Sequence, residues 1–463
     1  MRNAVFLCLL FLITFLSSCS SRRSFDIALK DASGRNIIIS PAPTAFQDVD
    51  RIMKSPGYWI SKLKNPDKTI LSRKEIENFN SQTVGKNIFL TDLRYFPSKY
   101  YRKSAAELHK RQLNTFSRYF NAYAKAPVGS AFFADMEKNI NYELFASTVD
   151  VKFAMTVKYA ELRALPTKEK LFSSLDTLDL DRMQITQLDM ASPLAVIYST
   201  KDKEWHYVIS EIAEGWVTKD SFAYCKQDTI RDYKRWDKIA VTISANSDIY
   251  KNQEMTDFFD YVKMGTALPL GDIKNDIVEI RIPVAKPDNS LGFRKAYMNL
   301  SDVSIGYMKY TQKNVLIQAF KHLNSPYGWG GMNGEQDCSS FIRQIFACFG
   351  IVMPRNSTGQ SQVGVFAGGF ESGEPEYIRA QRIIKNADPA IAVLYFPGHI
   401  MLYVGHDRQK PYIIHSIWGY GEDTEKESKK YVINRVAITS MDLGEASDKG
   451  SLLQRTVSVK NIR

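Results

Sequence analysis

The spacing of apolar residues along the chain changes character several times. In residues 100–126, apolar or aromatic side chains recur close to helical spacing, at Leu108, Leu113, Phe116, Phe120 and Tyr123. Lys and Arg residues lie between them, so the pattern predicts an amphipathic helix with a solvated basic face. This helix belongs to a partly helical, Pro-punctuated region, residues 20–145, in which we find no catalytic chemistry.

From residue 146 the chain changes to short β-branched and aromatic runs separated by Gly, Pro, Asn and Asp. The runs "VKFAMTVKYAELRALPT", "SPLAVIYST", "EWHYVIS" and "EGWVTKDSF" have the length and spacing of strands in a small β-barrel. A second set follows, from "IAVTISANSDIY" through "VKMGTALPL" and "IVEIRIPVA" to "GFRKAYMNL". We therefore predict two small barrels, at residues 146–237 and 238–305.

The last segment, residues 306–463, has the pattern of an α+β domain in which helices precede strands. Thr311 can cap the helix "QKNVLIQAFKHL", and a second helix with one broad apolar face follows Cys338 and stops at Gly350. The runs "IAVLYF", "GHIMLYVGH", "PYIIHSIWG" and "VINRVAI" predict strands. The charged stretch "GEDTEKESKK" between the last two is predicted as an exposed loop.

Length and composition agree with several folded domains. A chain of 463 residues suggests about three domains, and 44% hydrophobic with 24% charged residues excludes a disordered protein. The net charge of +11 is concentrated in residues 20–145, where 21 Lys and Arg face 12 Asp and Glu, a balance of +9. Such a basic region indicates a solvated face, or attraction to an anionic membrane or glycan. No nucleic-acid motif accompanies it.

The N-terminus predicts export. Arg2 is followed by the apolar run "AVFLCLLFLITFL", which is too short to span a bilayer comfortably. The run ends in "LSSC", which resembles the lipobox of bacterial lipoproteins, so Cys19 is the expected lipidation site and new N-terminus. Residues 1–19 would then be signal peptide and lipobox, and the chain an exported lipoprotein anchored on the periplasmic side. Ser20 favours the outer membrane. The alternative is an ordinary cleaved signal with an incidental cysteine.

Cysteine counting then leaves three thiols in the mature fold, Cys225, Cys338 and Cys348. An odd number in an oxidising compartment argues against a disulfide framework and for at least one free thiol. No pair of cysteines has the spacing of zinc ligands, so we predict no metal site. Cys225 and Cys348 are expected to be small core residues.

Cys338 differs because it stands at the first turn of its helix, after the glycine-rich loop "GWGGMNGEQD". Unpaired N–H groups and the helix dipole at that position favour a thiolate, the nucleophilic form. A base is needed beside it. An antiparallel hairpin centred near Asp407 would place His399 and His415 directly opposite each other on one face, with Cβ atoms about 5 Å apart. His406 would lie in the turn. The alternative is a pair of satisfied core histidines.

These residues predict a Cys-His-His arrangement in which Cys338 attacks a carbonyl, His399 exchanges the proton and His415 orients His399. A backbone N–H at the helix start, with a neighbouring N–H or the Tyr327 hydroxyl, could hold the oxyanion. The serine-hydrolase motif G-x-S-x-G and the phosphate-binding loop are both absent from the sequence.

Five segments in order resemble the NlpC-type papain-like cysteine peptidases that cut bacterial cell-wall peptides: "PYGWGG", "DCSSF", "MPRNSTGQS", "GHIMLYVG" and "IIHS". Upstream, "RALPT", Trp205, "GWV" and "GTALPL" resemble the paired bacterial SH3-like domains of multidomain members, which also carry an N-terminal stabilising region. The expected fold is therefore α+β and multidomain: an N-terminal helical or irregular region, two SH3-like barrels and a papain-like peptidase domain.

The resemblance implies cleavage of the bond between γ-D-glutamate and a diamino acid, typically meso-diaminopimelate, in peptidoglycan stem peptides, without a cofactor. Cys338 matches the nucleophile, His399 the base and His415 the third polar residue. In recycling-type relatives the residues matching Asp337 and Ser339 help to hold the free amino end of the peptide, with acidic and Tyr side chains of the first SH3-like domain.

Further residues match the family less specifically. Tyr327 matches an aromatic residue beside the active site, and Arg355, Ser357 and Gln360 match a segment that we interpret as structural. Ser340 stands where Gly is frequent, and the charged stretch after Tyr420 is an insertion at the cleft rim.

Two other functions remain open from the sequence. One is a different papain-like acyl chemistry, an N-acetylmuramoyl-L-alanine amidase or a transacylase. The other is a non-catalytic peptidoglycan-binding lipoprotein that uses its barrels. The expected partners are peptidoglycan peptides or muropeptides and a membrane, not nucleic acid, and the chain is expected to be a monomer. The SH3-like domains either bind wall polymer or close off the cleft.

Overall fold

A computed structural model describes residues 27–30, 36–41, 49–101, 119, 128–140, 148–173, 177, 179–425 and 427–463. The predicted signal peptide with Cys19 lies outside these residues. So does nearly all of the predicted helix over 100–126, and its first two residues belong instead to strand β3 (Lys99–Tyr101), paired with β4 (Thr148–Asp150). Within the described part of the chain, no helix is long and apolar enough to cross a membrane.

The first predicted barrel is a seven-stranded antiparallel sheet in the order β11-β5-β8-β9-β10-β6-β7. Its strands are β5 (Lys152–Thr156), β6 (Ala160–Arg163), β7 (Gln184–Leu188), β8 (Pro193–Ser199), β9 (Trp205–Ser210), β10 (Glu214–Thr218) and β11 (Phe222–Cys225). Helix α6 (Gln227–Lys234) follows. Tyr207 and Trp216 are fully buried between its layers, with ring centroids 5.6 Å apart.

The second predicted barrel is also a seven-stranded antiparallel sheet, in the order β14-β13-β17-β16-β15-β12-β18. Its strands are β12 (Ile239–Thr242), β13 (Asn246–Tyr250), β14 (Phe258–Lys263), β15 (Ala267–Lys274), β16 (Ile277–Ala285), β17 (Leu291–Asn299) and β18 (Val303–Ile305). Alternate residues of β16, Val278, Ile280 and Ile282, are fully buried, as expected for strands with one face on a core.

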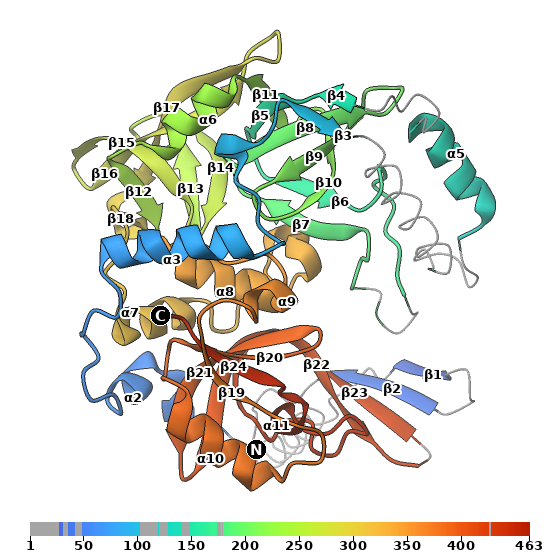
Figure 1. Ribbon diagram of the computed structural model, residues 1–463, viewed down its shortest axis with the longest axis vertical. Helices are drawn as coiled ribbons and strands as arrows, with labels where there is room; N and C mark the ends of the chain where they lie inside the picture. Colours follow the sequence, from blue (N-terminus) through green and yellow to red (C-terminus); the bar gives the residue numbers. More distant parts are fainter. Residues whose placement is uncertain are drawn as a thin grey trace, which may run out of the picture.

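The C-terminal segment contributes six strands to an eight-stranded sheet with helices packed against it, and β1 and β2 of the N-terminal region complete that sheet (Figure 1). The sheet order is β1-β2-β23-β22-β21-β20-β24-β19. Its strands are β1 (Ile27–Lys30), β2 (Asn36–Pro41), β19 (Val365–Gly369), β20 (Ala392–Phe396), β21 (His399–Asp407), β22 (Lys410–Asp423), β23 (Glu427–Ser440) and β24 (Ser458–Asn461). The helices are α7 (Gln312–Lys321), α8 (Cys338–Ala347), α9 (Ser357–Gln360), α10 (Glu376–Asn386) and α11 (Leu452–Arg455). The predicted α+β multidomain class is confirmed.

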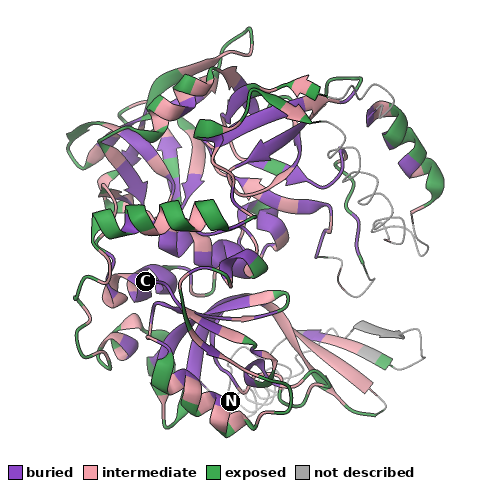
Figure 2. Cartoon of the chain, viewed as in Figure 1, coloured by how far each residue is buried: buried purple, intermediate pink, exposed green. Residues whose placement is uncertain are grey.

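The N-terminal region binds to the other domains through helix α3 (Arg73–Lys86), which crosses the junction between the barrels and the C-terminal sheet (Figure 1). Asn80 donates to the carbonyl of Gly350 at 2.7 Å and accepts from the N–H of Val352 at 2.9 Å. The start of α3 is fixed by a capping box between Ser72 and Glu75. The outer face of α3 is exposed (Figure 2), so the helix acts as a clamp over the end of α8. Two more helices are described in this region, α2 (Pro56–Ile60) and α5 (Ser130–Ile140).

The prediction of an exposed loop at "GEDTEKESKK" was wrong for most of this stretch. Residues 421–423 and 427–430 of this stretch extend strands β22 and β23, with Gly421 opposite Lys430 and Asp423 opposite Ser428, and β2 pairs with the same part of β23. Its described residues are exposed or half-buried, so no apolar alternation marks this ribbon in the sequence. Backbone pairing on both sides of β23 makes it a strand in spite of its composition.

The core of the C-terminal domain contains a buried histidine, His322, that is uncharged at neutral pH. His322 follows α7, is fully buried, and places its Nε2 atom 3.3 Å from the sulfur of Met264. Cys348 is fully buried in the same core, as predicted, whereas Cys225 is only half-buried. Burial lowers the pKa of His322 to about 3.

We expect this histidine to destabilise the fold as the pH falls. The unfolded state takes up its proton near pH 6.5, whereas the folded state takes it up only near its pKa of about 3. Stability is therefore complete above pH 6.5 and falls by up to about 1.4 kcal/mol per pH unit between the two values. Urea unfolding at pH 7, 6 and 5 should show a smaller pH slope for His322→Phe than for the native chain.

Candidate active site

Cys338 is the first residue of α8, as its position in the sequence predicts. Asp337 is the N-cap, and its side chain accepts a hydrogen bond from the N–H of Ser340 at 2.9 Å. Phe341, Ile345 and Phe346 bury the apolar face of the helix in the domain core. Cys338 itself is 8% exposed and belongs to the same buried cluster.

The glycine-rich loop before Cys338 positions the active-site helix against the first barrel. Gly330 and Gly331 have φ angles of 61° and 84°, and a Cβ atom on Gly330 would lie 2.7 Å from Gln184 of β7. Only glycine combines that backbone conformation with so close an approach. The loop is therefore a contact surface between two domains.

His399 and His415 come together on one face of the hairpin formed by β21 and β22. His399 Nε2 lies 2.8 Å from His415 Nδ1, and the ring centroids are 5.1 Å apart. The backbone N–H of Ile400, the residue after His399, lies near the Cys338 sulfur and acts to lower the pKa of that thiol. The structure thus brings the three predicted catalytic residues into one site.

The predicted register of this hairpin is corrected. The turn residues are Arg408 and Gln409, both with positive φ, and a bulge between Tyr403 and Gly405 shifts the pairing. Leu402 lies opposite Ile414, so His399 and His415 are diagonal neighbours instead of direct partners. The predicted pairing register differs from the observed one by two residues. Because a shift by an even number of residues keeps each side chain on the same face of the sheet, the two histidines still share a face. His406 is exposed, but at the end of β21 rather than in the turn.

The hydrogen bonds of the two histidines form a chain that ends at Thr439. His415 Nε2 lies 3.2 Å from the Thr439 hydroxyl, and Thr439 is fully buried. If His399 donates from Nε2 to His415 Nδ1, then His415 carries its own proton on Nε2 and donates it to Thr439. His399 Nδ1 then bears a free lone pair. Among the described residues Nδ1 has no hydrogen-bond partner, so it is available to the Cys338 thiol.

Burial makes the uncharged form the resting form of both the Cys338 thiol and the His399 imidazole. Burial, and then the negative charge of Asp337, raise the pKa of Cys338 to about 12, although the N–H groups of Ile400 and Ser339 oppose this rise. Burial and the nearby Arg455 lower the pKa of His399 to about 3. The expected resting thiolate is therefore not favoured, because loss of solvent outweighs the helix-start N–H groups. The thiol must lose its proton to His399 during attack.

Asp337 and Ser339 are engaged in a buried network with Arg355. Arg355 donates from Nη2 to Asp337 Oδ2 at 2.7 Å and from Nη1 to the Ser339 hydroxyl at 2.8 Å. Asp337 Oδ2 also accepts from the N–H of Gly330 at 3.1 Å, and Oδ1 from Arg355 Nη1 at 3.0 Å and from Ser339 at 3.1 Å. Both carboxylate oxygens are therefore used to hold the start of α8. Direct contact of Asp337 or Ser339 with a substrate stays a prediction.

Two sequence comparisons match parts of this architecture. The sequence model of the NlpC/P60 family matches residues 324–437, which contain Cys338, His399 and His415. A model described as SH3 domain (SH3b1 type) matches residues 170–218 in the first barrel. The C-terminal domain belongs to the NlpC/P60 family.

Known relatives share this domain or the whole arrangement. The chain is 29% identical over 125 residues to the bifunctional muramidase/DL-endopeptidase CwlT of Bacillus subtilis (strain 168), a match that covers 24% of this chain and 33% of that protein. The chain thus spans about a third of the length of this curated relative. A solved NlpC/P60 endopeptidase from Photobacterium damselae subsp. piscicida covers 91% of this chain and 99% of its own, with a TM-score of 0.72 at 19% identity. At that identity the likeness shows a shared fold.

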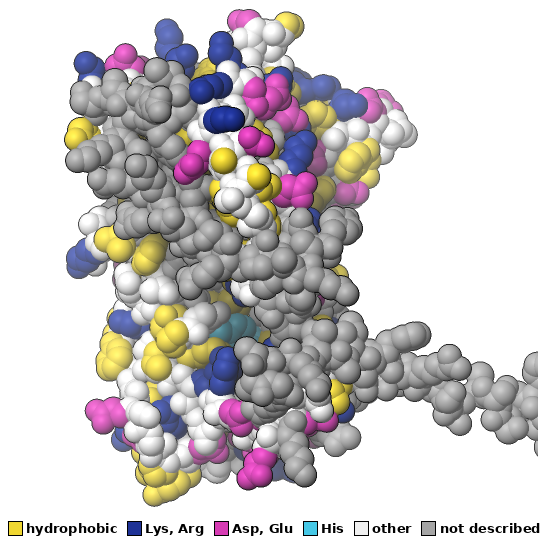
Figure 3. Space-filling model, turned by 90° about the vertical axis from the view of Figure 1, so that its right-hand side faces the viewer, with side chains coloured by type: hydrophobic (Ala, Val, Ile, Leu, Met, Phe, Trp, Pro, Cys, Tyr) yellow, Lys and Arg dark blue, Asp and Glu magenta, His cyan; other side chains and the backbone are white. Residues whose placement is uncertain are grey.

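The first barrel forms part of the wall beside the NlpC/P60 site. Arg355 Nε donates to the Thr186 hydroxyl of β7 at 2.5 Å, and the Trp418 indole donates to Asp179 at 2.7 Å. The Arg182 guanidinium lies over the Trp329 ring, 4.2 Å from its centroid. Figure 3 shows histidine atoms at the bottom of a recess between the upper and lower halves of the molecule, with hydrophobic side chains beside them. These contacts hold the barrel against the NlpC/P60 domain.

Tyr327 is half-buried at the start of this loop, and its N–H donates to the carbonyl of Asn434 at 3.0 Å. Burial, and then the negative charge of Asp337, raise its pKa well above the ordinary value, so its hydroxyl keeps the proton. It can therefore act as a hydrogen-bond donor at neutral pH, as an oxyanion contact requires.

Sequence reasoning missed Thr439 and left Arg355 without a specific partner. Thr439 lies in the apolar run "VINRVAITS", and a buried hydroxyl in such a strand is the one local sign of a polar partner. Nothing in the sequence indicates that Arg355 meets Thr186 of another domain. Among the described residues, no group of His, Cys, Asp or Glu is arranged to hold a metal ion.

We expect Thr439→Val to lower kcat/KM by about tenfold, because the buried His415 N–H would lose its acceptor and the tautomer that keeps His399 Nδ1 unprotonated would no longer be fixed. The measurement is kcat/KM against pH on a peptide substrate. Thr439→Ser keeps the hydroxyl and should retain most activity. A change in thermal stability with an unchanged pH profile would assign Thr439 a packing role only.

Proposed function

We propose that the chain is a cysteine endopeptidase of peptidoglycan, which cleaves the bond between γ-D-glutamate and a diamino acid such as meso-diaminopimelate in stem peptides. The observation that carries the proposal is the 2.8 Å contact of His399 Nε2 with His415 Nδ1, beside Ile400, whose backbone N–H lies near the Cys338 sulfur. The NlpC/P60 membership of the domain and its likeness to a DL-endopeptidase support it.

The arrangement supports a general-base mechanism. As the Cys338 sulfur attacks the γ-carbonyl carbon, its proton passes to His399 Nδ1, and His415 stabilises the resulting imidazolium through Nδ1. The oxyanion would accept hydrogen bonds from an N–H at the start of α8 and from the Tyr327 hydroxyl. His399 then protonates the amine of the diamino acid, which leaves. Water, deprotonated by His399, attacks the thioester and releases the γ-carboxylate and the free thiol.

The position of the first barrel supports a short peptide as the substrate. Its contacts through Thr186, Asp179 and Arg182 lie beside the recess, where a cross-linked polymer would meet the barrel before reaching Cys338. We therefore expect cleavage of free tri- or tetrapeptides rather than intact sacculi. In this proposal the SH3-like domains limit access to the site.

Digestion of two substrates tests the function. Purified sacculi and the free peptide L-Ala-γ-D-Glu-meso-diaminopimelate would each be incubated with the protein, and the products weighed by mass spectrometry. Release of L-Ala-D-Glu from the free peptide is the expected result. Release of an intact stem peptide from muramic acid, or transfer to an added amine, would instead identify an amidase or a transacylase. Binding without any product would identify a wall-binding protein.

We also propose that the protein is an exported lipoprotein, anchored through Cys19 on the periplasmic side of a membrane, and that it acts as a monomer. The lipobox-like "LSSC" and the short apolar run before it support the anchor. Labelling with a palmitate analogue in a bacterial host should mark the native chain and not Cys19→Ser. Light scattering of the chain without residues 1–19 would measure the oligomeric state.

A further inference from the structure

The guanidinium of Arg455 lies one aromatic ring away from the catalytic base. Arg455 is the last residue of α11, and its guanidinium carbon is 4.0 Å from the centroid of the Phe396 ring. That centroid is 5.4 Å from the centroid of the His399 ring. After burial, the positive charge of Arg455 is the next cause of the low pKa of His399. The cation is therefore within electrostatic reach of the base, and Figure 3 shows Lys or Arg atoms close to the histidine atoms of the recess.

Arg455 is half-buried, yet its charge has no partner among the described residues. No acidic side chain of the described chain forms an ion pair with it, and its guanidinium donates no hydrogen bond there. By contrast, Arg382 also lies against an aromatic ring but is paired with Glu374. Burial lowers the pKa of Arg455, because part of the water that would hydrate the cation is displaced. Its planar fork of donors is free to bind a carboxylate.

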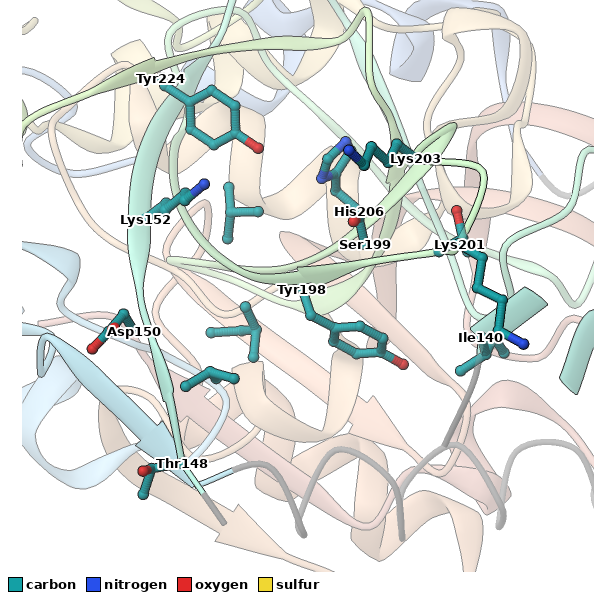
Figure 4. A pocket seen from close by; sticks show the side chains of 14 residues that line it. Ile140, Thr148, Asp150, Lys152, Tyr198, Ser199, Lys201, Lys203, His206 and Tyr224 are labelled. Carbon is teal, nitrogen blue, oxygen red and sulfur yellow. The ribbon is translucent and has the colours of Figure 1, made fainter. Parts of the chain in front are cut away.

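Other positive groups of the molecule are either paired or remote from the site. Lys201 and its neighbours in the first barrel line a separate cavity of about 730 Å³ (Figure 4). None of the residues lining that cavity belongs to the NlpC/P60 domain. Arg355, whose charge acts on Cys338, is already paired with Asp337. Arg455 is therefore a cation at the site that stays available to a substrate.

The place of Arg455 indicates which half of the substrate it meets. In the proposed mechanism His399 protonates the amine of the diamino acid, so the leaving half of the peptide lies beside His399. Helix α11 lies in the lower part of the C-terminal domain, whereas β7 of the first barrel lies above that domain (Figure 1). An extended meso-diaminopimelate spans about 7 Å from its α-nitrogen to its side-chain carboxylate. This length is of the same order as the gap that the Phe396 ring occupies between His399 and Arg455.

We propose that Arg455 binds the side-chain carboxylate of the leaving diamino acid and so determines specificity for diaminopimelate over lysine. The side chains of these two diamino acids both end in an ammonium group, but only diaminopimelate carries a carboxylate beside it. A lysine side chain would leave the Arg455 cation unpaired and would bring a second positive charge close to it. The inference rests on the proposed function, because it takes the γ-D-glutamyl bond as the bond that is cleaved at Cys338.

Two tripeptides that differ only in this carboxylate test the inference. L-Ala-γ-D-Glu-meso-diaminopimelate and L-Ala-γ-D-Glu-L-lysine have the same scissile bond and the same terminal α-carboxylate. The full chain should cleave the diaminopimelate peptide with a kcat/KM at least about tenfold higher. Arg455→Gln should remove most of this preference by lowering kcat/KM for the diaminopimelate peptide at least about tenfold, with the lysine peptide changed by no more than about twofold. A general change in His399 would alter both rates alike and cancel in their ratio.

Two further variants separate the contact from charge and from folding. Arg455→Lys keeps the charge but loses the fork of donors, so it should retain only part of the preference. Lys201→Gln removes one positive charge outside the NlpC/P60 domain and should leave both rates unchanged. Thermal unfolding of each variant checks the fold.

The possible results distinguish this inference from the proposed function. Equal losses on both peptides would assign Arg455 to a group that they share, such as the α-carboxylate, and would overturn its role in specificity. Unchanged rates in Arg455→Gln would overturn it as well, and in both cases the proposed bond would stand. Failure of the native chain to cleave either peptide would overturn the proposed function and the inference together.

Discussion

Replacing Cys338 by Ala is expected to lower peptide hydrolysis by at least about 10⁴-fold, because the nucleophile of a coupled catalytic set carries nearly all of its effect. Cys338 is 8% exposed at the helix start, and Ala keeps the backbone that Asp337 caps. Folding should therefore be unaffected. The measurement is product formation from the free tripeptide, followed by mass spectrometry, with thermal unfolding as the check on folding.

Cys348 provides the matched control, because it lies ten residues further along at the end of the same helix and is fully buried. Cys348→Ala should retain activity and lose roughly 1–2 kcal/mol of stability through the lost side-chain packing. Undiminished hydrolysis by Cys338→Ala would reject the assigned nucleophile. Loss of activity in both variants would point to a structural effect of altering α8.

Removing the Arg355 side chain is expected to destabilise the protein by about 3–5 kcal/mol, the usual cost of leaving a buried charge without its partner. The side chains of Arg355 and Asp337 are 6% and 11% exposed. Burial alone would raise the pKa of Asp337, but the Arg355 guanidinium lowers it, so the carboxylate stays charged. Arg355→Met would therefore strand a negative charge beneath Cys338. Urea unfolding at pH 7 measures the change.

A double substitution tests whether the stranded charge is the cause. Asp337→Asn combined with Arg355→Met removes both charges and should recover part of the stability lost in Arg355→Met. The exposed pair of Lys313 and Asp67, 3.0 Å apart, is the comparison: Lys313→Met should cost no more than about 1 kcal/mol. Equal costs for Arg355→Met and Lys313→Met would show that the buried pair contributes little.

Much of the candidate site could be predicted from local sequence. Apolar residues recur at helical spacing after Cys338, so the sequence predicts a helix that begins near Cys338. The same local evidence puts His399 and His415 on one face, since residues an even number of positions apart share a face of a strand. Short strands between turn residues likewise predict the two barrels.

The ionisation states of Cys338 and His399 could not be predicted from local sequence. A helix start favours a thiolate, yet burial raises the pKa of Cys338 to about 12 and lowers that of His399 to about 3. Burial depends on which distant segments cover a group. The bulge beside Gly405 and the left-handed turn at Arg408 are decided by packing against neighbouring strands.

The sequence by itself determined the domain types, the nucleophile's place at the head of a helix and the shared face of the two histidines, because these follow from periodicity within short segments. The tertiary structure decided the hairpin register, the uncharged resting forms of Cys338 and His399, and the partners of Asp337. Each of these depends on contacts between residues far apart in the chain, such as Arg355 with Thr186, whose free energies come from desolvation and pairing that no local pattern encodes.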